Sequence, residues 1–223
     1  MVGANQAARN ANDGISMMQT ADSGLENVSA NLQRMRELAL QSANDTYSPS
    51  DRQAMQLEYE QNQAQVRQTV ESTDFNGHKH LSNQASLTFQ VGANGDPASD
   101  QTVVSTENIL ANKDVNNALS HSDITSQTSG SDAIAKIGAA LEHVTLERVR
   151  LGATQNRLEY TVSNLQVTSE NSAAAKSRIE DTDYAQQTAE LTRSLIMHKA
   201  GMAAAAYGNV SSQMVAGLLN RVV

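Results

Sequence analysis

Two short runs of this sequence hold side-chain types that could do chemistry. His78 and His80 flank a lysine directly after the turn pair Asn76-Gly77. Imidazoles at alternate positions could begin a metal site, but they supply at most two ligands, and the nearby sequence offers no third one. A surface loop is therefore the favoured interpretation. The other three histidines are isolated, and we expect solvated side chains at His121, His143 and His198.

The second run is acidic and extends from Glu180 to Asp183. Paired carboxylates act as general acid and base only where a cleft shifts the pKa of one of them. A position at a helix end favours a solvated or capping role instead. The sequence also contains no glycine-rich phosphate loop, nucleophile elbow or HExxH pattern. We therefore expect no enzyme, no catalytic or cofactor-binding residues and no metal site.

Composition narrows the class of protein. Of the 223 residues, 39% are hydrophobic and only 3% aromatic, which favours thin seams between helices over a globular enzyme core. The net charge of −8 and the scattered basic residues argue against nucleic-acid binding. Cysteine is absent, which excludes thiolate chemistry. We see neither a signal peptide nor a stretch of about 20 apolar residues, so we expect no membrane insertion.

The longest predicted element is a helix from Ser131 to about Asp183, where we expect a break. Arg148 and Gln155 interrupt its apolar seam and are candidates for fixing the register of packing. Steps of three and four separate the apolar residues, as in packed helices: Ile137, Leu141, Val144, Leu151, Leu158, Val162 and Leu165. At 1.5 Å per residue its part from Ser131 to Ile179 would extend roughly 70 Å, which implies a rod.

Two further helices are predicted before it, over residues 4–44 and 49–73. Ser48 suits the cap of the second helix, and Pro49 suits its first position. In the first helix, apolar residues again recur at steps of three and four: Met18, Ala21, Leu25, Val28, Leu32 and Met35. Three helices with apolar faces predict a bundle.

The middle of the chain has a different pattern. From Leu87 to Val91 apolar and polar residues alternate, which indicates a half-buried strand. Thr102-Val103-Val104 offers a partner strand, so we expect one β-hairpin at about 86–106. Residues 107–130 are rich in Asn, Ser, Asp and Thr and predict a surface connection, with a short turn of helix near 115–119.

The last segment, residues 184–223, carries apolar residues but also Gly201 and Gly208, which make it a poor helix by itself. An apolar tail of this kind needs a partner to cover it. Its candidate contact residues are Leu191, Leu195, Ile196, Met202, Met214, Leu218 and Leu219.

Blocks near both ends of the chain resemble bacterial flagellin. The first block comprises ARNANDGIS at 8–16, LQRMREL at 32–38 and FNG at 75–77. The second comprises LGA at 151–153 and SRIEDTDY at 177–184. The resemblance implies a structural subunit of the flagellar filament with a mainly α fold. This fold would be an elongated helical rod or bundle with heptad-like seams and one β-hairpin (D1), followed by a carboxy-terminal helical tail (D0).

The resemblance places residues 1–183 in the rod domain D1 and residues 184–223 in the carboxy-terminal half of the inner domain D0. The amino-terminal partner helix of D0 and the outer variable domains would then be missing, with only residues 109–130 in place of the latter. We expect the tail to be disordered or bound by another protein, and the chain not to polymerise by itself.

The same resemblance implies a route and a set of partners. Flagellins are exported by the flagellar type III apparatus, and an export chaperone wraps the carboxy-terminal segment in the cytoplasm before export. Residues 184–223 would bind that chaperone here. After export, the protein would be secreted to the extracellular filament, where its partners are other copies of the subunit.

The resemblance also implies innate immune recognition. Toll-like receptor 5 docks on an LQRxREL-type segment of the first rod helix and on a Glu of the next helix. The matching positions are Gln33, Arg34, Leu38 and Glu58. Alternatively, Leu38 is a core residue and Arg34 a solvated charge or a subunit contact.

Two other functions remain open. A flagellar hook–filament junction protein shares the terminal architecture of flagellin, although the LQRMREL and SRIEDTDY blocks favour flagellin. A flagellin-like cell-surface protein that binds glycans or acts as an enzyme belongs to a different class. Such an activity usually resides in the outer domains.

Overall fold

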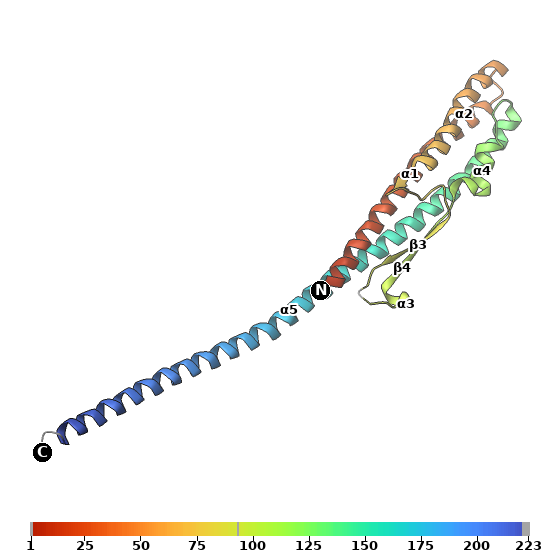
Figure 1. Cartoon of the computed structure of the whole chain (residues 1–223). Coiled ribbons are helices and arrows are strands. Elements are labelled where there is room, and N and C mark those ends of the chain that lie inside the picture. The colour runs from red at the N-terminus through yellow and green to blue at the C-terminus, as the bar shows by residue number, and fades with distance from the viewer. Residues whose placement is uncertain (1, 93, 220–223) are drawn as a thin grey trace. The chain divides into compact units, whose positions relative to one another are not determined.

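The computed structural model describes residues 2–92 and 94–219, apart from the side chains at 181–183, 209, 211–213 and 216–219. The chain divides into two units, Met1–Ser169 and Glu170–Val223. Figure 1 shows the following elements in order: α1 (Val2–Ser42), α2 (Pro49–Ser72), β1 (Asp74–Phe75), β2 (His78–Lys79), β3 (Ala85–Gln90), α3 (Pro97–Asp100), β4 (Gln101–Thr106), the short 3-10 helix η1 (Ile109–Ala111), α4 (Lys113–Ser120) and α5 (Gln127–Leu219).

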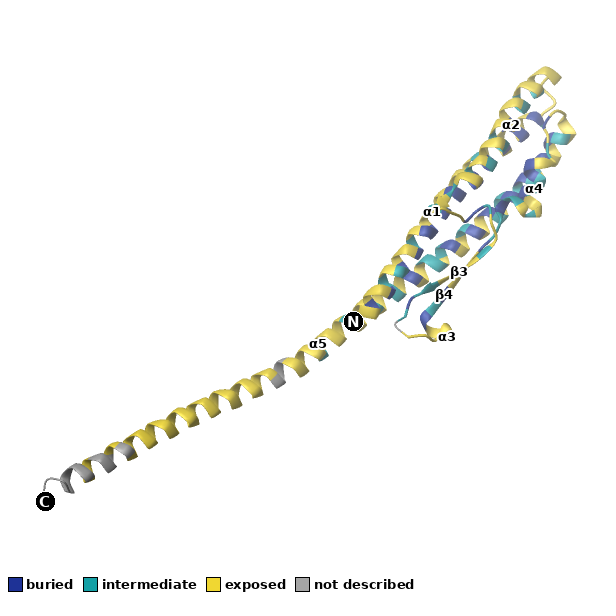
Figure 2. Cartoon of the chain, in the orientation of Figure 1, coloured by how far each residue is buried: buried dark blue, intermediate teal, exposed yellow. Residues whose placement is uncertain are grey.

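The first unit is a helical bundle whose core lies between α1, α2 and the first part of α5 (Figure 2). The predicted apolar face of α1 points into this core with Met18, Leu25, Val28, Leu32 and Met35, each at most 1% exposed. From α5 the core receives Ile137, Ala140, Val144 and Leu151. The mainly α fold class with packed apolar seams is therefore confirmed.

One glycine permits the close approach of α1 to its neighbours. On local chemistry Asn12-Asp13-Gly14 favours a turn, but α1 passes through it without interruption. A Cβ atom at Gly14 would lie 3.0 Å from Cδ1 of Leu158 and 3.3 Å from the ring of Phe89. Tertiary packing therefore overrides the local preference of this segment.

The turn between α1 and α2 is fixed by polar contacts that the sequence indicates. Ser48 and Asp51 form a reciprocal capping box at the start of α2, with Pro49 in the first turn. Hydrogen bonds from Ser48 lower the pKa of the Asp51 carboxyl. Arg52 donates from Nε to the carbonyl of Ser42 at 2.9 Å and from Nη2 to that of Asn44 at 3.0 Å, which closes the loop onto α1.

The predicted β-hairpin is present and packs on the helices through its apolar face. β3 and β4 pair antiparallel with Leu87 opposite Val104 and Phe89 opposite Thr102. Leu87 and Phe89 are half-buried against the core. A second, smaller hairpin pairs β1 with β2 around Asn76 and Gly77, which both adopt positive φ, as a tight hairpin turn requires.

The prediction of a surface connection over residues 107–130 is wrong in part. The expected short turn of helix near 115–119 is present as α4, but the segment also contains η1, and five of its apolar side chains are buried in the core: Ile109, Val115, Ala118, Leu119 and Ile124. Two of its asparagines act as helix caps, since Asn108 caps η1 and Asn112 caps α4. The polar composition therefore reflects short elements with caps, and not a solvated loop.

The predicted bounds of the long helix also need correction. α5 begins at Gln127, before Ser131, and continues through residues 180–183 to Leu219 without the expected break. The acidic run contains neither glycine nor proline, so nothing in the backbone stops the helix there. The carboxy-terminal segment, expected to be disordered or bound, is helical in its described residues, up to Leu219. Among the described residues, no helix combines the length and apolarity needed to cross a membrane.

The core role of residues 107–130 can be tested with Ile124→Ala. Ile124 is fully buried, so the truncation should leave a cavity and lower the free energy of unfolding by about 2–5 kcal/mol. The matched control is Leu57→Ala, because the Leu57 side chain is 66% exposed and should change stability by about 0.5 kcal/mol or less. Urea unfolding followed by tyrosine fluorescence gives both values. Equal, small losses would mean that this connection is solvated.

Candidate recognition and assembly surfaces

A charged patch forms where α1 lies beside α2. Arg34 of α1 donates from Nε to Oε1 of Glu58 on α2 at 2.7 Å and from Nη1 to Oε2 of Glu37 at 2.9 Å. All three side chains are about half exposed. The bonds to Glu37 and then Glu58 raise the pKa of the Arg34 guanidinium. We call Gln33, Arg34, Glu37 and Glu58 the Arg34 patch.

The structure brings together three of the four predicted receptor contacts. Gln33 is exposed on the same helix turn as Arg34, and Glu58 is bonded to it. Leu38 is different, because its side chain is only 1% exposed and belongs to the core. Leu38 is therefore a core residue, as the alternative interpretation held, and its side chain is not accessible for direct contact with the receptor. Sequence reasoning missed Glu37, although a spacing of three residues on a helix is a recognised signal for an ion pair.

A second charged contact joins α5 to α1 inside the first unit. Arg148 donates from Nε to Oδ1 of Asp22 at 2.7 Å and from Nη2 to Oδ2 at 3.2 Å, a bidentate geometry with directional preference. Glu26 lies 3.8 Å from the same guanidinium. The bond to Asp22 is the main cause of the raised pKa of Arg148. Gln155 instead bonds Glu159 on α5 itself, so only Arg148 of the two interruptions makes such a described cross-helix bond.

The second unit presents a different kind of surface. Every side chain described between residues 184 and 215 is exposed (Figure 2), which includes large apolar ones. The predicted tail residues that it exposes are Leu191, Leu195, Ile196, Met202 and Met214. Leu218 and Leu219 lie outside the described side chains. Such a helix face offers apolar contact and no polar constellation for chemistry, so it suits packing against another helix.

The histidine pair after the small hairpin is only partly a surface feature. His78 is exposed as predicted, whereas the prediction is wrong for His80, which is 5% exposed. Burial, followed by the electrostatic effect of His78, lowers the pKa of His80, which favours its neutral form. Among the described residues, no third ligand-type side chain joins the two histidines into a metal-binding group.

Comparison with known proteins decides the family. A model of the bacterial flagellin N-terminal helical region matches residues 1–86, and one of the C-terminal helical region matches residues 134–219. The flagellin of Halalkalibacterium halodurans is 40% identical over 218 residues, covering 97% of this chain and 79% of that protein. The chain belongs to the bacterial flagellin family.

Other flagellin relatives agree in sequence and in fold. The flagellar filament 33 kDa core protein of Treponema phagedenis is 36% identical over 229 residues, covering 97% of this chain and 80% of that protein. The crystal structure of Bacillus cereus flagellin superimposes with a TM-score of 0.63 at 26% identity, covering 75% of this chain and 94% of that one.

The flagellin fold is shared with a neighbouring class. A putative flagellar hook-associated protein from Vibrio parahaemolyticus also superimposes with a TM-score of 0.63, covering 78% of this chain and 90% of that one. Its sequence identity is only 14%, so this likeness concerns the fold alone. Sequence, and not the fold, therefore separates flagellin from hook-associated proteins here.

Proposed function

We propose that this chain is a structural subunit of a bacterial flagellar filament, which serves motility and grows by packing subunit helices against one another. The observation that carries the proposal is the exposed apolar helix face of residues 184–215 in a chain whose helical regions match flagellin. The first unit, by contrast, covers its apolar seams internally. In this proposal residues 1–183 are the rod domain D1 and residues 184–223 the carboxy-terminal half of D0.

The two alternative functions gain less support. A hook–filament junction protein would have this fold, but the relatives with 36% and 40% identity are named as a filament core protein and a flagellin. No specific observation favours a glycan-binding or enzymatic flagellin-like protein. The Arg34 patch is exposed and already paired, which suits protein recognition better than the chemistry of a reaction.

The exposed face of the second unit also supports a cytoplasmic partner before export. An amphipathic or apolar helix that is not yet assembled needs a cover to prevent association. We assign this cover to the flagellar export chaperone, which would bind residues 184–223 before the type III apparatus secretes the chain to the extracellular filament. Leu191, Leu195 and Ile196 would supply apolar anchors of this contact.

Serine substitutions test the chaperone contact. The triple variant Leu191→Ser, Leu195→Ser and Ile196→Ser should weaken binding to the export chaperone of the same bacterium more than about 100-fold, because each buried large apolar side chain contributes about 1.5–3 kcal/mol. Isothermal titration calorimetry measures both affinities. The control carries three serines in the first unit, at the exposed Leu57, Val103 and Leu146, and should bind normally. Unchanged affinity of the tail variant would refute this contact.

The Arg34 patch supports recognition by Toll-like receptor 5 as a second property of the assembled or released subunit. Its arginine is held in one orientation by carboxylates from two helices, while about 45% of its side chain stays exposed. Arginine is one of the residue types enriched at interface hot spots. Gln33 and Glu58 would complete the contact, and Leu38 would support it only from the core.

Receptor recognition is tested with Arg34→Ala in a cell reporter assay for Toll-like receptor 5. Loss of the guanidinium should raise the concentration for half-maximal signalling at least about 10-fold, as is usual for a hot-spot residue. Arg9→Ala is the matched control, because Arg9 is an exposed arginine on the same helix outside the patch, and it should signal as the parent does. If Arg34→Ala signals undiminished, the patch is not a receptor site.

A further inference from the structure

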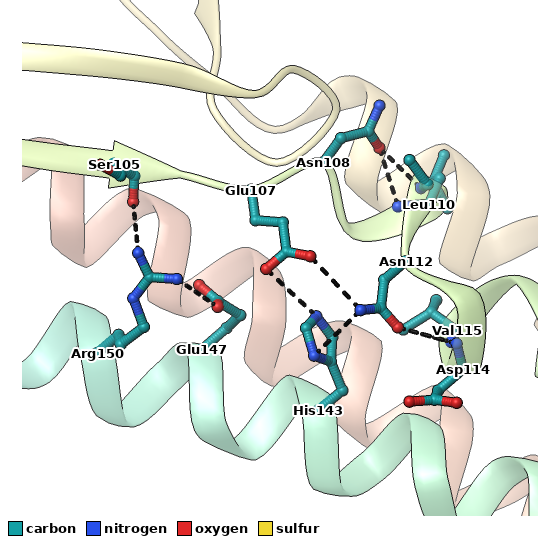
Figure 3. A network of polar contacts seen from close by, with 11 residues as sticks. Ser105, Glu107, Asn108, Leu110, Asn112, Asp114, Val115, His143, Glu147 and Arg150 are labelled. Carbon is teal, nitrogen blue, oxygen red and sulfur yellow. Dashed lines mark hydrogen bonds and ion pairs between the residues drawn. The ribbon is translucent and has the colours of Figure 1, made fainter.

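A polar cluster lies where the end of the β-hairpin meets α5, far in sequence from the Arg34 patch (Figure 3). Glu107 follows β4, and Asn112 caps α4. His143 and Glu147 stand one turn apart on α5, so their side chains share one helix face. All four residues belong to the first unit. His143 is therefore neither isolated nor solvated, contrary to the prediction from the sequence.

The cluster brings three metal-ligating groups close together. One ligand atom each of Glu107, His143 and Glu147 lies within 4.8 Å of the others. Nε2 of His143 is buried and has no hydrogen-bond partner among the described residues. Its distance of 3.9 Å to Oε2 of Glu107 is too long for a hydrogen bond. A buried polar atom of this kind is costly unless something binds it.

The charge balance of the cluster favours a cation. Glu147 is only 7% exposed, and a buried carboxylate needs compensation. It receives a bond of 2.8 Å from Nη1 of Arg150, whose side chain is 54% exposed. With Glu107 nearby, two carboxylates face one guanidinium. A second positive charge would therefore balance the cluster.

We propose that Glu107, His143 and Glu147 bind one divalent transition-metal ion of the zinc type. An imidazole with two carboxylates suits Zn²⁺, Co²⁺ or Ni²⁺ better than Ca²⁺ or Mg²⁺, which prefer oxygen ligands alone. Bonds of about 2.0–2.1 Å in tetrahedral geometry place ligand atoms about 3.4 Å apart. The present separations are at most 4.8 Å, so rotation of the two glutamate side chains would supply the small contraction needed.

The asparagine beside His143 determines how the imidazole must change on binding. Oδ1 of Asn112 accepts from the backbone N–H groups of Asp114 and Val115, so its Nδ2 faces Nδ1 of His143 at 3.3 Å. Nδ1 is then an acceptor, and Nε2 carries the imidazole proton. When a metal binds at Nε2, the one proton of the imidazole lies on Nδ1 instead. The new Nδ1–H then faces the Nδ2 donor of Asn112, so two hydrogen-bond donors oppose each other.

An aspartate at position 112 should make the site bind metal more tightly. Aspartate at position 112 caps a helix as well as asparagine does. Its second carboxylate oxygen would accept the new Nδ1–H of His143, an arrangement that commonly supports metal-ligating histidines. Asn112→Asp should therefore raise the affinity for zinc about 10-fold. The ion would tie the segment before α4 to α5 and raise the melting temperature of the first unit.

The test is calorimetric titration of the full chain with ZnCl₂ after removal of metal by a chelator. We expect binding of one ion per chain, weakened at least about 10-fold by His143→Gln and by Glu107→Gln. Circular dichroism in chelator verifies that each variant is folded. Glu107→Gln is the safer variant, because its side chain is 38% exposed. His78→Gln is the control, since it removes an exposed histidine outside the cluster and should bind as the parent does.

A second control separates geometry from added charge. Asn108→Asp also replaces a capping asparagine and adds the same charge beside Glu107, but its Oδ1 caps η1 and makes no described bond to His143. It should gain much less affinity than Asn112→Asp. The proposal is overturned if the chain binds no zinc saturably, if Glu107→Gln or His143→Gln binds as the parent does, or if His78→Gln abolishes binding. Equal gains for both aspartate variants would overturn the role of Asn112.

Discussion

Burial of one apolar face of α1 is the interaction on which the first unit depends. This face meets α2 on one side and the first part of α5 on the other, within one continuous core. Each large side chain that becomes fully buried contributes about 1.5–3 kcal/mol. Burial along this seam therefore provides most of the free energy that stabilises the three long helices. The hairpin, η1 and α4 then add apolar side chains to the same core.

The charged contacts take their positions from this seam. Arg34 can reach Glu58 because α1 and α2 are packed side by side, and Arg148 can reach Asp22 because α5 lies along α1. Both pairs are partly exposed, so they contribute to orientation more than to stability. Packing also assembles the Glu107, His143 and Glu147 cluster, whose members come from two separate stretches of chain. Packing thus creates the three polar groups that join distant stretches of the chain.

Periodicity in the sequence predicted the long elements well, because apolar residues at helical spacing report directly on a buried face. Ile109 and Ile124 escaped notice, since single apolar residues in an Asn-rich segment show no period. Leu38 could not be assigned between core and receptor from its type alone. The extent of α5 was underestimated because an acidic run suggests an end, although only glycine, proline or a cap would impose one.

The polar cluster shows a different limit of the sequence. The spacing of His143 and Glu147 on one helix face was visible, but Glu107 precedes them by more than thirty residues and becomes a neighbour only through the fold. His143 therefore looked isolated. The two-helix origin of the Arg34 patch was predicted only through resemblance to flagellin, because no local pattern relates Arg34 to Glu58.

The two units differ in one physical respect, which also explains the proposed function. The helix α5 buries part of its apolar side chains in the core of the first unit, whereas every described side chain between residues 184 and 215 is exposed. A helix whose apolar side chains are covered is stabilised by tertiary packing, whereas an uncovered helix in water is only marginally stable. The second unit is thus prepared to gain stability from a partner, as a subunit of a polymer must be.

The central claim is that tertiary packing stabilises α5 only within the first unit. Hydrogen exchange of the full chain, followed by mass spectrometry of peptides, measures this directly, because amide protection reports local opening free energy. The account predicts strong protection in α1 and in residues 131–158, and exchange faster by several orders of magnitude in residues 184–215. Equal protection along the whole of α5 in the isolated chain would contradict the account.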